Sequence, residues 1–160
     1  MIYDNGQMRD PSSEESSQIN TKIGGGTSRF ELVHDFEINA PFTSKSFNLD
    51  GYDELVVEVI ATGSVSQNMW MQIWSGTNNA SVSVANFFTT SERRELIRFF
   101  RLAPNLFEVG LTGQVQGLRD CKLNNIDNYK DKLTKVTIGI TGANTIVSGR
   151  IKIYGRNIKE

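Results

Sequence analysis

The chain has 160 residues, enough for one domain that buries about 70% of its unfolded surface. Its 17 Lys and Arg against 18 Asp and Glu give a net charge of -1 without a basic stripe, so we expect no nucleic-acid partner. The single cysteine excludes an intrachain disulfide and a cysteine-based metal cluster, and no apolar run approaches the roughly 18 residues of a membrane span. The first residues, "MIYDNGQMRD", show no secretory signal, so we expect synthesis in a reducing cytoplasm.

Residues 1–28 differ in composition from the rest of the chain. They are rich in Ser, Glu and Gly, and their large apolar residues are Ile2, Tyr3, Met8, Ile19 and Ile23. This is too little apolar surface to offset the entropy lost when a chain orders into a domain. Two interpretations remain, a disordered tail or an anchoring arm that orders on a partner, with the glycine run in "IGGGTS" as a swivel.

Beyond the arm, apolar residues recur at every second position, a pattern typical of half-buried strands. In "RFELVHDFEI" the pattern places Phe30, Leu32, His34, Phe36 and Ile38 on one face. The segment "LDGYDE" predicts a turn, and "LVVEVIA", "MWMQIW" and "SVSVANFF" predict the strands that follow.

The second half of the chain continues the pattern. "RRELIRFFRL" lacks a capping box, and the turn signal "APN" separates it from "LFEVGLTG", so the two predict a hairpin. "LNNIDNYKDKL" predicts a loop or one short helix. "KVTIGITG" and "SGRIKIYG" predict a closing hairpin, in which Ile151 and Ile153 lie against the face of Val136, Ile138 and Ile140.

Seven to nine short strands with frequent turns and almost no helix predict an all-β fold, an antiparallel β-sandwich of the jelly-roll type with an extended N-terminal arm. We expect two parts, an arm over residues 1–28 and a β-sandwich domain over residues 29–160.

Residues for catalysis or metal binding are sparse. The one histidine, His34, lies on the apolar face of its predicted strand while Asp35 points the other way, so a buried, hydrogen-bonded histidine is expected rather than a catalytic one. The carboxylates that a glycan hydrolase would need are interpreted as turn or solvent-facing groups, and they are Asp53, Glu54, Glu58 and Glu108. We therefore predict a protein without catalytic residues, metal ligands or a cofactor.

The segment "NMWMQIWSG" is the strongest functional feature. On a strand, Met69, Met71 and Ile73 share one face and leave Trp70, Gln72 and Trp74 on the other. The tryptophan side must be covered by the domain's own loops, by a second subunit or by a glycan whose sugar rings stack on the indoles. In the last case the nearby polar residues Asn78 and Asn79 would supply hydrogen bonds.

The segments "TIVSGRIKIYGR" and "LDGYDELVVEVIATGS", together with the polar arm, resemble small β-sandwich proteins of tailed-bacteriophage virions. The resemblance implies a non-enzymatic virion component made in the host cytoplasm, a head fibre, capsid decoration or tail-fibre domain that forms a homotrimer. Residues 1–28 would bind capsid or tail proteins, and the β-domain would face outward, with adhesion to the host surface as one role. The alternative function is a carbohydrate-binding module that uses Trp70 and Trp74.

Overall fold

The computed structural model describes residues 2–4, 7–9, 29–103, 106–113, 117–122 and 132–158. Two short strands near the N-terminus, β1 (Ile2–Asp4) and β2 (Gln7–Arg9), pair with each other in antiparallel fashion. The remaining ten strands build two antiparallel sheets. They are β3 (Glu31–Ile38), β4 (Ser44–Tyr52), β5 (Glu54–Gly63), β6 (Gln67–Ser75), β7 (Asn78–Phe88), β8 (Arg93–Ala103), β9 (Leu106–Gly113), β10 (Gly117–Lys122), β11 (Leu133–Ile140) and β12 (Ile146–Arg156).

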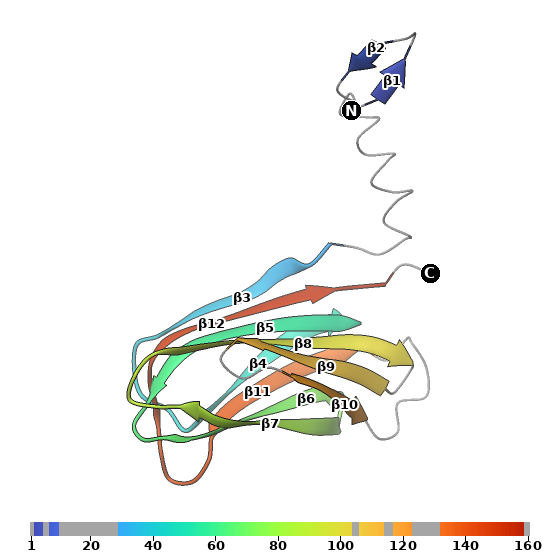
Figure 1. The fold of residues 1–160 in the computed structure, drawn as a ribbon. Helices are drawn as coiled ribbons and strands as arrows, with labels where there is room; N and C mark the ends of the chain where they lie inside the picture. The colour runs from blue at the N-terminus through green and yellow to red at the C-terminus, as the bar shows by residue number, and fades with distance from the viewer. Residues whose placement is uncertain are drawn as a thin grey trace.

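The two sheets form the layers of a sandwich (Figure 1). One sheet has six strands in the order β10-β9-β8-β5-β12-β3, and the other has four in the order β4-β11-β6-β7. The pairs β3–β12, β4–β11, β5–β8 and β6–β7 are those of a long hairpin of eight strands folded over on itself, which is the jelly-roll arrangement. Strands β9 and β10 extend the six-stranded sheet beyond β8. The predicted fold class, an antiparallel jelly-roll sandwich, is therefore confirmed.

The core lies between the sheets because alternate residues of each strand point inward. Strand β5 shows the pattern clearly, since Leu55, Val57, Val59 and Ala61 are fully buried and the residues between them are half-buried. The facing sheet contributes inward side chains from all four of its strands, which include Phe47, Met71, Val84 and Ile138. β-branched and aromatic residues suit such pleated, half-buried surfaces, so the strand pattern and the core have the same cause.

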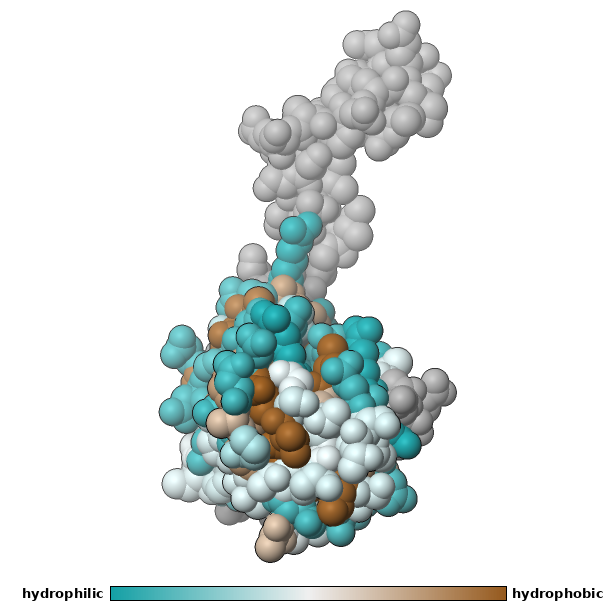
Figure 2. All heavy atoms as spheres, turned by 90° about the vertical axis from the view of Figure 1, so that its left-hand side faces the viewer, coloured by the Kyte–Doolittle hydropathy of each residue, from teal (hydrophilic) through white to brown (hydrophobic). Residues whose placement is uncertain are grey.

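The ends of the sandwich differ. Strand β3 starts beside the end of β12, where Glu31 pairs with Gly155. The start of β3 and the end of β12 therefore lie at the same end of the sandwich (Figure 1). At the opposite end, backbone hydrogen bonds join the loops to one another, from Phe42 to Ile146 and from Ser64 to Thr145. Figure 2 shows this second end, where hydrophobic residues form narrow groups among neutral and hydrophilic ones.

Three sequence predictions need correction. Leu32 is 52% exposed rather than on the inward face, because an irregularity in the pairing of β3 with β12 reverses the alternation before His34. "LDGYDE" is mostly strand, since β4 runs to Tyr52 and the chain turns at Asp53. Strands β11 and β12 form no hairpin, because they belong to different sheets. Ile151 and Ile153 do share the core with β11, as expected.

The predictions for the arm and for "LNNIDNYKDKL" fall largely outside the described residues. This holds for Ile19 and Ile23 of the arm and for residues 123–131. The arm residues Ile2, Tyr3 and Met8 are described only as members of β1 and β2. The domain boundary between residues 28 and 29 stays a prediction.

Candidate functional site

The tryptophans lie on the outer surface of the four-stranded sheet. Strand β6 buries Met69, Met71 and Ile73 against the core, as predicted, and turns its alternate side chains outward. Trp70 and Trp74 are thus not interior residues, and each ring stays half-buried on the sheet surface. The expectation that the domain's own loops enclose the indoles in the core is therefore wrong.

Strand register sets the neighbours of each tryptophan. Three rows of cross-strand partners run over β4, β11, β6 and β7, and we call these twelve residues the neutral face. The rows are Ser44–Gly139–Trp70–Ser83, Ser46–Thr137–Gln72–Ser81 and Asn48–Lys135–Trp74–Asn79. Hydroxyl and amide side chains fill most positions, so the face offers many hydrogen-bonding groups. Its one charged residue is Lys135.

A glycine fixes the position of Trp70. A Cβ atom added to Gly139 would lie 2.1 Å from Cζ2 of the indole, so the ring occupies the space directly above that glycine. The indole Nε1 donates a hydrogen bond to the carbonyl of Ile140 at 3.2 Å. The ring therefore extends across β11 and is held by both packing and a hydrogen bond.

Trp74 is held differently. The ammonium group of Lys135, its cross-strand partner, lies 4.0 Å from the centre of the indole ring. The indole Nε1 is buried and has no hydrogen-bond partner among the described residues. Among the described residues, Trp70 thus has a hydrogen bond that Trp74 does not have.

Between the two indoles lies a row of polar groups. Thr137 is only 8% exposed, and its hydroxyl is hydrogen-bonded to that of Ser46 at 2.9 Å. Gln72 separates the tryptophans along β6, as predicted. Of the predicted asparagines, Asn79 faces Trp74 on β7, whereas Asn78 pairs with Ser75 at the β6–β7 turn, one position beyond the face.

Sequence reasoning missed the contribution of β4 and β11 to this face. Lys135, Thr137 and Gly139 alternate along "KVTIGI", a pattern that placed them on one side of a strand without showing which strand lay beside them. From the sequence we predict no strand over residues 44–49, so the serines and Asn48 of β4 are not placed on this face.

The outer surface of the six-stranded sheet has a different character. Arg150 binds Asp35 through two hydrogen bonds of 2.6 and 2.8 Å, which lowers the pKa of Asp35 and raises that of Arg150. Arg94 pairs with Glu58 on the same surface. These ion pairs lie on the outer surface of the six-stranded sheet, whereas the neutral face contains Lys135 as its one charged residue.

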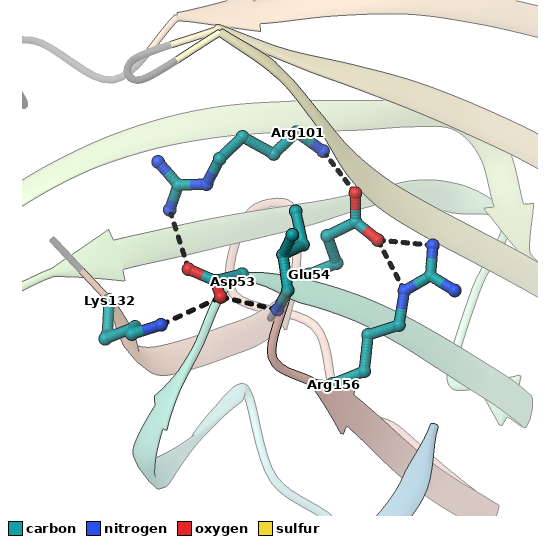
Figure 3. A network of polar contacts seen from close by, with 6 residues as sticks. Asp53, Glu54, Arg101, Lys132 and Arg156 are labelled. Atoms are coloured by element: carbon teal, nitrogen blue, oxygen red, sulfur yellow. Dashed lines mark hydrogen bonds and ion pairs between the residues drawn. The ribbon is translucent and has the colours of Figure 1, made fainter. Parts of the chain in front are cut away.

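The carboxylates Asp53 and Glu54 belong to a buried network at the end where β3 begins (Figure 3). Asp53 accepts hydrogen bonds from Lys132 at 2.8 Å and from the backbone of Ile158 at 2.7 Å. Glu54 accepts from the side chain of Arg156 at 2.6 Å and from the backbone N–H of Arg101 at 2.9 Å. Asp53 does lie at a turn, but the interpretation of these two carboxylates as solvent-facing groups is wrong, because their partners allow both to be buried.

His34 joins the two sheets at their edge. Its Nε2 donates to the carbonyl of Asn48 at 2.6 Å, and its ring lies 5.4 Å from that of Phe47. The histidine is hydrogen-bonded, as predicted, but it is half-buried rather than buried, because β3 is the edge strand of its sheet. The described residues contain no group of three or more His, Cys, Asp and Glu side chains arranged to bind a metal ion. They also contain no helix with the length and apolar character of a membrane span.

No protein-family model and no curated protein sequence matches this chain. Among solved structures, the chain is similar to the Caenorhabditis elegans galectin LEC-6, with 12% identity and a TM-score of 0.39 over 77% of this chain and 95% of that one. It is also similar to the carbohydrate recognition domain of Emp46p in a potassium-bound form, with 8% identity and a TM-score of 0.42 over 84% and 91% of the two chains.

Proposed function

We propose that this protein is a non-enzymatic glycan-binding domain whose neutral face holds an extended sugar chain. The observation that carries the proposal is the pair of half-exposed indoles on a surface made mostly of hydroxyl and amide groups. Aromatic rings take up the less polar faces of sugar rings, and convergent polar groups fix their orientation.

The spacing of the indoles sets the shape of the ligand. Trp70 and Trp74 are four residues apart on one strand, which corresponds to roughly 13 Å at about 3.3 Å per residue. Gln72 lies between them on β6, and Ser81 lies beside it on β7. An oligosaccharide that runs along β6 would stack on both rings and direct hydroxyl groups toward these side chains.

A second copy of the chain is the competing occupant of this face. Protein interfaces are also enriched in tryptophan, but their cores are well-packed apolar patches. The neutral face instead surrounds each indole with polar groups, such as Ser83 beside Trp70 and Asn79 beside Trp74. This composition favours a hydroxyl-rich ligand.

The test uses the fact that the chain has only 2 tryptophans, both on this face. Intrinsic fluorescence therefore reports on the site without a label. A panel of neutral and acidic polysaccharides is titrated into the full-length protein, and binding is measured by fluorescence and calorimetry. We expect at least one polymer to bind, with its affinity strongly reduced in Trp70→Ala and Trp74→Ala.

Tyr154→Ala is the matched control, because Tyr154 is a half-buried aromatic on the outer surface of the six-stranded sheet. It should bind as the wild type does. Circular dichroism and thermal unfolding verify that each variant is folded. If no polymer binds, or if folded tryptophan variants bind like the wild type, the proposal is wrong. A dimer that dissociates in the tryptophan variants, measured by light scattering, would support the second-copy alternative.

We also propose, as a second function, that the domain is displayed on a virion from its N-terminal end. The supporting observation is that β3 begins beside the end of β12, while tied loops form the opposite end. An arm that precedes β3 would then attach the domain and leave those loops outermost. A variant lacking residues 1–28 should fold yet fail to join its particle, and full incorporation would contradict the idea. Light scattering tests the homotrimer expected for this role.

A further inference from the structure

The neutral face has one charged residue, Lys135, and its ammonium group lies over the indole ring of Trp74. Of the twelve residues in the three rows, Lys135 is the one with a charged side chain. Its ammonium group lies 4.0 Å from the centre of the Trp74 ring. Within the described part of the chain it has no acidic partner, in contrast to Lys132, which binds Asp53.

The two tryptophans are therefore unequal as stacking surfaces. Trp70 is fixed by Gly139 and by its hydrogen bond to Ile140, and no cation lies over it in the described structure. Trp74 has an ammonium group over its ring and a buried indole N–H without an acceptor among the described residues. A sugar can stack on the ring face that the ammonium occupies only if Lys135 moves aside.

The chemistry of the incoming sugar decides the cost of this movement. A neutral sugar displaces the ammonium from the ring and offers it no charge in return, so the cation–π contact is lost. A sugar that carries a carboxylate displaces it and then binds it as an ion pair beside the ring. The lysine would thus favour acidic sugars at Trp74 while leaving Trp70 to bind neutral ones.

We propose that the neutral face selects a carboxylate-bearing glycan, with Lys135 binding the carboxylate of the sugar that stacks on Trp74. This inference rests on the proposed glycan-binding function and adds the substrate class to it. Lys135 is a specificity-determining residue in this account, and the indoles supply most of the affinity.

The experiment compares each acidic polymer with its own neutral form. Polygalacturonate, alginate and hyaluronate are titrated by tryptophan fluorescence, and each is then titrated after its carboxylates have been reduced to alcohols. We expect reduction to weaken wild-type binding by about fivefold, the effect of one exposed ion pair, and rising salt to weaken binding of the acidic form only.

Lys135→Met keeps the length of the side chain and removes the charge. It should bind the acidic polymer about fivefold more weakly than the wild type and should no longer distinguish it from the reduced form. Lys135→Arg should retain the preference. Lys152→Met, which removes a cation from the outer surface of the six-stranded sheet, is the matched control and should behave as the wild type.

The outcomes separate the two proposals. If reduced and acidic polymers bind the wild type equally, or if Lys135→Met weakens both equally, the carboxylate inference is overturned and the glycan-binding function stands. If the only polymers that bind are neutral, the inference is likewise overturned. If no polymer binds at all, the proposed function itself falls.

Discussion

Gly139→Ala moves Trp70 without removing its ring. The new methyl group would lie 2.1 Å from Cζ2 and 2.3 Å from Cε2 of the indole, so the ring must leave its place over β11. Displacement breaks the hydrogen bond to Ile140, at a cost of about 1 kcal/mol. If about 60 Å² of additional indole surface is exposed, the loss adds about 1.5 kcal/mol. We therefore expect the free energy of unfolding to fall by about 2.5 kcal/mol while the sandwich remains folded.

The assay places Gly139→Ala in a Trp74→Phe background, where Trp70 is the one remaining tryptophan. Its fluorescence emission should shift to the red as the ring becomes exposed, and glycan affinity should fall toward that of Trp70→Ala. Gly110→Ala is a matched control, since its added methyl group would meet the guanidinium of Arg98 on the other sheet at 2.7 Å. Unchanged emission and affinity in Gly139→Ala would refute the claim that this glycine positions the stacking surface.

Three further substitutions test the scaffold. Glu54→Ala leaves the buried backbone N–H of Arg101 and the guanidinium of Arg156 without their shared acceptor. The free energy of unfolding, measured in urea, should therefore fall by about 3 kcal/mol, and a fall below about 1 kcal/mol would contradict a stabilising role of the network. Burial, helped by a hydrogen bond to Glu31, raises the pKa of Tyr52, so the stability present below about pH 10 should fall as pH rises through the folded-state pKa. Tyr52→Phe should lack this alkaline loss of stability in urea unfolding, and a pH profile identical to that of the wild type would refute the assignment. Gly149→Ala places a methyl group 1.9 Å from a carbonyl oxygen of β5, at a position whose φ of +130° already disfavours alanine. Thermal unfolding should show that the free energy of unfolding falls by about 3 kcal/mol or more, whereas near-wild-type stability would show that the strand can shift.

The alternation of single strands was predictable from the sequence, and their partners were not. The split of β6 into a buried methionine side and an outward tryptophan side follows directly from a period of two. Strand β7 follows β6 directly in the chain, but β11, the neighbour on the other side, comes from far along it, and this pairing depends on how eight strands fold over one another. The sequence therefore pointed to Trp70 and Trp74 but not to Gly139 or Lys135.

Two local errors have identifiable causes. In β3, one irregular residue reverses the alternation, so a strict period of two placed Leu32 on the wrong side. Asp53 and Glu54 follow a glycine in a turn-like segment and so suggested a solvated loop. Their burial depends on Arg101, Lys132 and Arg156, which lie far along the chain and meet them only in the folded domain.

The most direct test of the central claim is a nuclear magnetic resonance titration of the full-length protein with a polysaccharide that binds. The two indole N–H signals, one for each of the 2 tryptophans, and the backbone amides of Thr137 and Gly139 should shift together as ligand is added. Amides on the outer surface of the six-stranded sheet, such as Lys152, should stay unchanged. Shifts confined to that other sheet, with the indole signals unmoved, would contradict the account.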